Sequence, residues 1–413
     1  MRILLVTPMP PQSQGTGAIP VMLQMLMVAL RLRHEVTLVT VIGPDPTEWQ
    51  AVECLRESGL EVHAAQLMQS SSVQRWQRRW RLASSWLKGR YPWRTIWFWE
   101  PSIQQILDDL LAQKRFDLIQ VEDNAMGAYH YRTALPIVFT EHEVRRSRPV
   151  QWRKPDDQSW INWALSEMDW RRWSRYQREV WKRFDRIQVF TTRDAARIRS
   201  MVPGVADRVR VNPFGIELPI RSDPDIEQSD TVVFVGNFTH LPNVDAALWL
   251  GHEIMPRLRE LCPGVRLSLV GIYPPPNVIA LACSDIVVTG AVPKIEPILE
   301  RAAVVVAPLR IGGGMRMKVL YAMAMGKAVV TTSRGMEGLA IDGWQPPLVV
   351  ADDAVDIALA AAQLLRSVED RRALGNEARL FVEEHYSPLA YAHRLEAIYA
   401  ELRPSDFDQD FDR

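Results

Sequence analysis

The sequence of 413 residues has few cysteines and no long apolar run. Its three cysteines (Cys54, Cys262 and Cys283) are scattered, so the sequence predicts neither a zinc site nor a disulfide framework. No stretch approaches the roughly 20 apolar residues of a membrane-spanning helix. The opening residues, MRILLVTPMPP, lack the features of a signal peptide and predict a first strand. We therefore expect a reducing, cytoplasmic setting.

The sequence also lacks the patterns of several functional classes. Its serines and cysteines have no nearby histidine and aspartate pattern that would mark a nucleophile, and no histidine or cysteine cluster has metal-ligand spacing. No nucleic-acid-binding motif accompanies its basic residues. We expect no metal, no bound cofactor and no nucleic-acid partner. Hydrophobic residues make up 47% of the chain and charged residues 24%, as in a soluble globular protein of two domains.

The net charge of zero hides a difference between the two halves of the chain. Residues 1–212 contain 31 lysines and arginines against 22 aspartates and glutamates, and the remainder contains 18 against 27. Such a split indicates different partners for each half, or two domains that differ only in surface composition.

Short β-branched or apolar runs alternate with helical patterns along the chain. This alternation predicts an α/β fold with parallel sheets and right-handed crossovers. A polar stretch at 217–230 divides the pattern into two Rossmann-like domains, 1–215 and 230–388, whose ligands are expected at the carboxyl ends of the strands. A helix at 389–402 could pack back on the first domain, and a polar tail follows at 403–413. The expected strands are 3–7, 35–40, 118–121, 137–140, 187–191, 232–235, 266–270, 286–289, 303–307 and 328–332.

The stretch from 308 to 339 carries the most specific signal. After a strand come three glycines, Gly312, Gly313 and Gly314, and then the start of a helix with Arg316 and Lys318 in its first turn. Glycines let backbone N–H groups approach a ligand, and a helix N-terminus favours anions. Cations are disfavoured there, so an anion should offset them. We expect a diphosphate here; the alternative is a plain strand-to-helix turn.

This stretch resembles the C-terminal signature of family 4 (group 1) of the retaining glycosyltransferases. The resemblance continues at 208–217, 234–246 and 288–299, spans most of residues 180–400, and is closest to a branch associated with exopolysaccharide and cell-envelope polymers. The N-terminal match is weaker. The residues that carry the signature are Gly312 to Gly314, Arg316, Lys318, Ala324, Gly326, Lys327, Val329, Val330, Gly335, Glu337, Gly338 and Leu339.

The resemblance implies a GT-B fold, in which the C-terminal domain holds the nucleotide-sugar donor and the N-terminal domain holds the acceptor. By the same resemblance, Gly236 and Asn237 face the donor, and Glu337 lies near its sugar or phosphates. The chain departs from the family pattern in two respects. Many members have a glutamate that binds the ribose hydroxyls where this chain has Tyr321, whose single hydroxyl cannot accept from both. Relatives also place arginine and lysine where this chain has Asn237 and Asn243.

On the acceptor side, His142 follows the predicted strand at 137–140, where a loop reaches the ligand edge of the sheet. Family members commonly carry a histidine there that contacts the donor sugar or the acceptor, which makes His142 the candidate catalytic residue. The alternative is a histidine packed against Glu141 or Glu143. Gly15 and Gly17 follow the first strand and resemble the glycine loop that lines the acceptor site.

A segment at 73–99 has six tryptophans and seven basic residues but no acidic residue. Tryptophan and arginine together on one helix are typical of a membrane interface with anionic lipid. We expect Arg75, Trp76, Arg78, Arg79 and Trp80 to face such a membrane. The alternative is a helix that packs its tryptophans into the domain core.

These observations predict a retaining glycosyltransferase that moves a sugar from a nucleotide-diphosphate sugar to a glycan or lipid-linked glycan. Its expected place is the inner face of the membrane, in exopolysaccharide or cell-envelope polysaccharide synthesis. Two alternatives remain open at this point: a sugar-nucleotide epimerase of the same architecture, and a non-catalytic subunit that binds a partner enzyme or a glycan.

Overall fold

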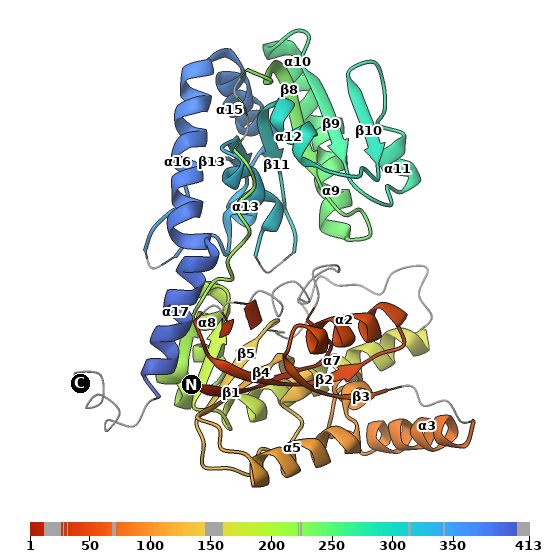
Figure 1. The fold of residues 1–413 in the computed structure, drawn as a ribbon. Helices are drawn as coiled ribbons and strands as arrows, with labels where there is room; N and C mark the ends of the chain where they lie inside the picture. The colour runs from red at the N-terminus through yellow and green to blue at the C-terminus, as the bar shows by residue number, and fades with distance from the viewer. Residues whose placement is uncertain are drawn as a thin grey trace, which may run out of the picture. The chain divides into compact units, whose positions relative to one another are not determined.

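The structure, a computed structural model, describes residues 1–11, 26–27, 29–30, 32–67, 72–144, 160–221, 223, 225–312, 315–341 and 343–402, without the side chains at 72–75, 77–79 and 161. The chain forms two compact units. Unit 1 comprises Met1–Phe190, Asp194–Pro213 and the chain from Ala392 onward, and unit 2 comprises Thr191–Arg193 and Phe214–Tyr391. Figure 1 labels the elements of each unit.

Unit 1 is built on a sheet of seven parallel strands in the order β3-β2-β1-β4-β5-β6-β7. The central strands read as continuous apolar runs because both of their faces are covered: Ile3, Leu4, Leu5 and Val6 are all buried. The strands are β1 (Arg2–Thr7), β2 (Glu35–Ile42), β3 (Glu61–Gln66), β4 (Leu118–Glu122), β5 (Ile137–Glu141), β6 (Arg186–Val189) and β7 (Val209–Val211).

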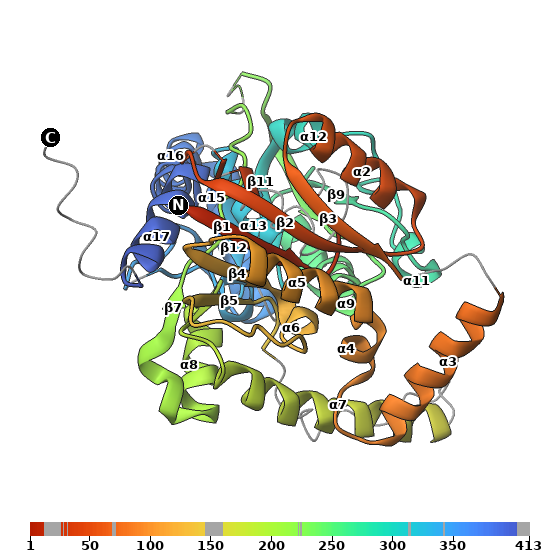
Figure 2. The same cartoon turned by 60° about the horizontal axis from the view of Figure 1, so that its bottom comes forward.

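Helices between these strands cover the sheet. The amphipathic α5 buries Ile103, Leu107 and Leu110 against it, and the end of α7 adds Val180 and Trp181 to the same core. Figure 2 shows α5 lying along the sheet. The described helices of unit 1 before residue 213 are α2 (Pro46–Glu57), α3 (Ser72–Leu87), α4 (Trp93–Phe98), α5 (Pro101–Gln113), α6 (Asp123–Met126), α7 (Trp160–Trp181), α8 (Thr192–Met201, which starts at the boundary with unit 2) and the 3-10 helix η1 (Pro203–Arg208).

The last helix, α17 (Pro388–Ala400), returns the chain to unit 1 at Ala392. Its Tyr399 hydroxyl donates to Gln120 Oε1 on β4 (3.1 Å), and its Glu396 pairs with His34. Just past the helix, Glu401 forms ion pairs with Arg210 and Arg186. These contacts attach the C-terminal segment to unit 1 through polar groups.

Unit 2 has a sheet of six parallel strands in the order β10-β9-β8-β11-β12-β13. Helices pack on both faces and form two apolar cores, one with the helices α9 to α10 and α15, the other with α13 and α16. The strands are β8 (Gln228–Val235), β9 (Arg266–Val270), β10 (Ile286–Gly290), β11 (Ala302–Ala307), β12 (Ala328–Thr331) and β13 (Val349–Val350). The helices are α9 (Leu241–Trp249), the π-helix η2 (Leu250–Ile254), α10 (Met255–Leu261), α11 (Pro276–Ile279), α12 (Glu296–Arg301), α13 (Met317–Ala324), α14 (Ser333–Met336), α15 (Ala354–Arg366) and α16 (Val368–Tyr386).

None of the helices in the described ranges combines the length and apolar character needed to cross a membrane. Nor do histidine, cysteine, aspartate and glutamate side chains gather there in groups of three or more that could hold a metal ion.

Candidate functional site

The loop that follows β8 packs tightly against its neighbour. A Cβ atom on Gly271, the residue after β9, would lie 1.7 Å from the Gly236 carbonyl oxygen, so the two loops meet backbone to backbone. Asn237 uses its side chain to accept from the Thr239 backbone N–H (3.0 Å), which closes a local turn. Its backbone carbonyl accepts from Asn243 Nδ2 (2.6 Å). The side chain of Asn237 is therefore held in its own turn.

Helix α13 begins at the same edge of the sheet, after the glycine-rich loop. Gly312 has a φ of +102°, a conformation that glycine adopts readily and other residues do not. Arg316 occupies the cap position, where no side chain caps the described first turn of the helix. Such a helix start offers backbone N–H groups and a partial positive charge to an anion.

Two cations lie at this helix start. Arg316 is only 8% exposed, and its Nε and Nη2 donate to the Arg334 carbonyl (3.2 Å each). Lys318 donates to Asn243 Oδ1, and its Nζ lies 4.7 Å from the centre of the Phe234 ring. Burial, reinforced by the charge of Arg316, lowers the pKa of Lys318 to about 7. An arriving anion would favour the charged form of this lysine.

One helical turn further along α13, Tyr321 meets a carboxylate. Its hydroxyl donates to Glu296 Oε1 (2.6 Å) at the start of α12. This hydrogen bond is the largest of the effects that lower the pKa of Glu296. Many family members have a carboxylate at position 321. In this chain, Glu296 of α12 places a carboxylate beside that position.

A hollow of about 610 Å³ opens at the carboxyl ends of β11 and β12. The Arg334 carbonyl that holds Arg316 belongs to a residue of this lining, so the hollow adjoins the start of α13. Glu337 forms an ion pair with Arg334 (2.6 Å). The lining consists of Leu309, Arg310, Thr332, Ser333, Arg334, Met336, Glu337 and Asp352.

In unit 1, a histidine and a carboxylate pair at the ends of β4 and β5. His142 Nε2 lies 2.7 Å from Glu122 Oε2, and the Glu122 side chain is fully buried. Gln120 Nε2 donates to the other Glu122 oxygen (2.8 Å). Burial alone would lower the pKa of His142, but the hydrogen bond and charge of Glu122, with the nearby acidic groups, raise it above its ordinary value.

The neighbouring Glu141 is a buried acceptor for four donors. Asn124 Nδ2 and the Glu143 backbone N–H donate to Oε1, while Trp181 Nε1 (2.8 Å) and Gln177 Nε2 (3.2 Å) donate to Oε2. Burial raises the pKa of Glu141 to about 7, although the hydrogen bonds from Asn124, Trp181 and the Glu143 backbone act in the opposite direction. Glu141 therefore organises the loop after β5, while His142 pairs with Glu122 and not with Glu141 or Glu143.

Two family models match the chain over most of its length. Residues 17–215 match the model described as glycosyl transferase 4-like domain, and residues 229–367 match the model described as glycosyl transferases group 1. The chain belongs to the group 1 glycosyltransferases. The second match includes the β8 loop, α13 and the hollow, so the polar groups of unit 2 lie within the part of the chain that defines this family.

Solved structures share the fold of this glycosyltransferase over nearly the whole chain. Sucrose-phosphate synthase from Thermosynechococcus elongatus has a TM-score of 0.64 at 16% identity, over 97% of this chain and 98% of that one. HepE from Anabaena, solved with UDP and glucose, has a TM-score of 0.59 at 13% identity, over 97% and 99%. The α/β class and the GT-B fold predicted from sequence are confirmed.

A curated relative comes from Klebsiella pneumoniae. It is an uncharacterized 44.6 kDa protein in the cps region, 22% identical over 177 residues. The match spans 41% of this glycosyltransferase and 45% of that protein. The chain thus covers less than half the length of this relative.

Several predicted site residues cannot be placed. Gly15, Gly17, Gly313 and Gly314 lie outside the described residues, as do the side chains of Arg75, Arg78 and Arg79. By contrast, Trp76 and Trp80 on α3 are 62% and 60% exposed, with their rings 5.8 Å apart. These two tryptophans are therefore on the surface and not in the core of unit 1.

Three polar residues that were not predicted as site residues contact the predicted ones. Asn243 links the β8 loop to Lys318, Glu296 accepts from Tyr321, and Glu122 holds His142. Asn243 is 75 positions from Lys318, Glu296 is 25 positions from Tyr321, and Glu122 is 20 positions from His142. Glu296 lies within the stretch 288–299 that resembles the family, but nothing in its spacing connects it to position 321.

Proposed function

We propose that this glycosyltransferase moves a sugar from a nucleoside diphosphate sugar to a hydroxyl of a glycan or lipid-linked glycan, with retention of anomeric configuration. The observation that carries the proposal is the start of α13, where Gly312, the buried Arg316 and Lys318 meet an uncapped helix N-terminus. Such a constellation suits a diphosphate. The Anabaena protein of the same fold, solved with UDP-glucose, supports a donor of this class.

The reaction requires little covalent help from the protein. The bond between the sugar C1 and the phosphate oxygen breaks, and a bond from C1 to the acceptor oxygen forms on the same face of the ring. The acceptor proton passes to the departing phosphate. Arg316 and Lys318 would stabilise the negative charge that grows on the diphosphate as it leaves, because oriented cations in a partly buried site act strongly on developing charge.

Glu296 would bind the nucleoside end of the donor. One of its carboxylate oxygens accepts from Tyr321. A carboxylate has lone pairs for further donors, so the second oxygen can accept from a ribose hydroxyl. Tyr321 would then orient the carboxylate and would not bind the ribose by itself. This arrangement supplies the carboxylate that position 321 lacks, and so favours a working donor site over a non-catalytic subunit.

His142 would contact the transferred sugar or the acceptor. Glu122 holds its Nε2, which fixes the orientation of the ring and leaves Nδ1 for a ligand. The relative from the cps region supports a role in polysaccharide assembly.

The first test is thermal unfolding with a panel of nucleoside diphosphates and their sugars. A ligand at 100 times its Kd stabilises a protein by about 2.7 kcal/mol, enough to detect. Lys318→Gln keeps a hydrogen-bond donor for Asn243 but loses the positive charge. The stabilisation of this variant by a nucleoside diphosphate should therefore be much smaller than that of the wild type. Arg257→Gln is the matched control, because Arg257 is exposed on α10, donates to the Glu253 carbonyl (2.6 Å) and does not belong to the start of α13.

Activity then separates the remaining possibilities. NMR of the sugar first released or transferred should show the anomer of the donor. The opposite anomer would exclude retention. Absence of any nucleotide response at millimolar concentration would exclude the transferase and favour a non-catalytic binding role, and release of a stereoisomer of the donor sugar without an acceptor would indicate an epimerase.

We also propose that unit 1 docks on an anionic membrane surface, on the inner face of the membrane. The exposed Trp76 and Trp80 share α3 with Leu87, which is 75% exposed. Exposed aromatic and aliphatic side chains on a helix without acidic residues fit the headgroup region of anionic lipid.

Sedimentation with vesicles tests this docking. The double variant Trp76→Ser and Trp80→Ser should lose binding to phosphatidylglycerol vesicles, because two interfacial aromatic rings are removed. Trp344→Ser removes a tryptophan of unit 2 that is 63% exposed and should change nothing. Equal binding of all three proteins, or no binding by the wild type, would contradict the proposal.

A further inference from the structure

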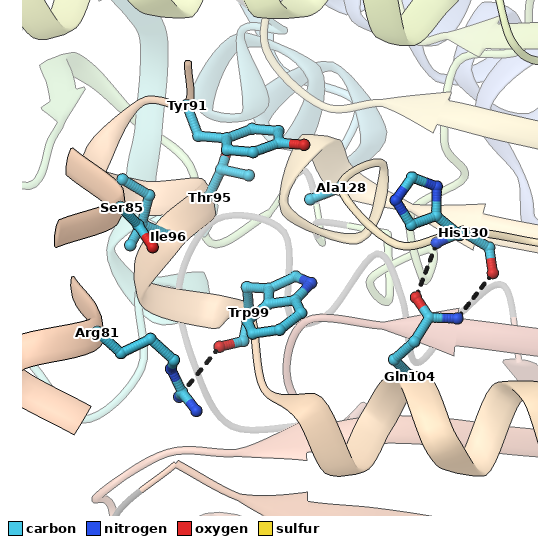
Figure 3. Close-up of a pocket in the computed structure, with 9 residues that line it drawn as sticks. All are labelled: Arg81, Ser85, Tyr91, Thr95, Ile96, Trp99, Gln104, Ala128 and His130. Carbon is cyan, nitrogen blue, oxygen red and sulfur yellow. Dashed lines mark hydrogen bonds between the residues drawn. The ribbon is translucent and has the colours of Figure 1, made fainter. Parts of the chain in front are cut away.

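Unit 1 contains a cavity whose lining includes none of the residues assigned above. Its volume is about 230 Å³, and it lies among α3, α4, the start of α5 and the segment after α6 (Figure 3). The lining combines rings, aliphatic groups and polar groups: Arg81, Ser85, Tyr91, Thr95, Ile96, Trp99, Gln104, Ala128 and His130.

Two aromatic rings face this cavity. Figure 3 shows Tyr91 and Trp99 on different sides of it, with His130 and Ser85 at its flanks. Both rings are held by further aromatic contacts, because Trp99 stacks with Tyr129 (6.4 Å between ring centres) and Tyr91 meets the edge of Tyr176 (5.7 Å). The cavity therefore offers preformed flat apolar surfaces.

The charge beside the cavity is neutralised. Arg81 forms an ion pair with Glu100 (2.7 Å), which is 5% exposed, and its guanidinium also lies 5.5 Å from the centre of the Trp99 ring. The side-chain amide of Gln104 is already hydrogen-bonded to the His130 backbone. It donates to the His130 carbonyl (2.8 Å) and accepts from the His130 N–H (2.9 Å). An anion is therefore a poor ligand for this cavity.

Hydroxyl groups in the lining have unused hydrogen-bonding capacity. Thr95 is 1% exposed and lies where it can donate to the Tyr176 hydroxyl, which gives its own proton to the Asn124 carbonyl (2.6 Å). None of the described residues donates to the Thr95 oxygen. Its lone pairs are therefore available to a donor, which favours a ligand that brings hydroxyl groups of its own.

We propose that this cavity binds one neutral pyranose ring of a saccharide. The apolar face of such a ring would pack on Trp99 and Tyr91, and its hydroxyls would meet Thr95, Ser85 and His130. The volume is suitable, because a cavity of about 150 Å³ already holds benzene. An acyl chain would leave these polar groups without partners. Only the origin of the sugar, in the glycan that the enzyme extends, rests on the function proposed above.

Saturation-transfer NMR on the full chain tests this inference. The probes are methyl glycosides of glucose, galactose, mannose and N-acetylglucosamine at millimolar concentration. Ser85→Phe places a ring into the cavity from a half-buried helix position, and should weaken glycoside binding at least tenfold. The matched control is Ser84→Phe, at the adjacent exposed position of α3, which is not part of the lining.

Thr95→Val removes the buried hydroxyl with little change of shape and should weaken binding of the preferred glycoside several-fold. The thermal response of Ser85→Phe to UDP should equal that of the wild type, which separates this cavity from the donor site. Absence of binding by all four glycosides would overturn the proposal. So would binding that survives Ser85→Phe, or binding of hexanol in place of glycosides.

Discussion

The Tyr321 hydroxyl donates to Glu296 Oε1 at 2.6 Å, across 25 positions of sequence. Tyr321 lies on α13 and Glu296 begins α12, so the contact joins two elements on the same edge of the unit 2 sheet. Burial first, and then the hydrogen bond to Glu296, raise the pKa of Tyr321, which therefore remains a donor throughout the physiological range. The carboxylate is thereby held in a fixed orientation.

Glu296→Ala should weaken binding of a nucleoside diphosphate by about tenfold to a hundredfold, as expected for a lost charge-assisted hydrogen bond. Tyr321→Phe should weaken binding of the same nucleotide by about threefold or less, because it removes only the hydroxyl that orients the Glu296 carboxylate. Calorimetry with ribose and deoxyribose nucleotides provides the control. The wild type should prefer the ribose form and Glu296→Ala should not; an undiminished preference would place the ribose elsewhere.

The affinity for a nucleoside diphosphate should fall as the pH rises above 7. The pKa of Lys318 is about 7 in the free protein, and a bound diphosphate would raise it because the anion favours the charged form. Binding then takes up a proton, so each pH unit above 7 weakens affinity by up to about tenfold until the bound pKa is reached. Titrations between pH 7 and 9 measure this slope. Lys318→Arg stays charged over this range, so the affinity of that variant should not depend on pH. A slope that persists in the variant would show that another group takes up the proton.

Glu122→Gln should lower the pKa of His142, because the carboxylate that raises it is lost while the burial that lowers it remains. A histidine with a raised folded pKa contributes stability that is fully present below its unfolded pKa of about 6.5 and is lost as the pH rises through the folded pKa. The variant should therefore lose more stability at pH 6 than at pH 8, by about 1.4 kcal/mol per unit of pKa change. Urea unfolding at both pH values tests this expectation. An equal loss at both would show that the pair acts through packing alone.

Gly271→Ala should destabilise unit 2 by about 3 kcal/mol or more, because its Cβ would overlap the Gly236 carbonyl oxygen. Gly264→Ala is the control, since Gly264 also has a positive φ (+90°) but has open space around a Cβ. Its cost should be only about 1 kcal/mol. Similar losses in denaturant unfolding would show that the β8 and β9 loops move apart easily.

Much of the fold could be predicted because strand and helix patterns are local. The expected strand at 137–140 is β5 (Ile137–Glu141), and the strand expected at 303–307 is β11 (Ala302–Ala307). The helical run between β8 and β9, from Leu241 to Leu261, contains the π-helical turn η2 (Leu250–Ile254). The apolar pattern does not reveal this change of hydrogen bonding, because the buried face is nearly the same.

The exposed position of Trp76 and Trp80 could not be predicted in the same way. An amphipathic helix with tryptophans on one face is compatible with core packing and with exposure. In the structure, Leu82 is buried among the described side chains of α3, while Trp76 and Trp80 lie on its outer surface. The choice between these faces depends on the neighbouring helices, and their arrangement is a property of the folded unit.

Residue types at fixed local spacing are enough to identify the family, the two α/β units and the glycine-rich start of α13. Folding, and no local pattern, brings Glu296 to Tyr321 and Asn243 to Lys318, and encloses a cavity with Tyr91, Thr95, Trp99 and His130. These contacts join residues from different elements. Their neighbours are set by the packing of helices on sheets, which no local pattern specifies.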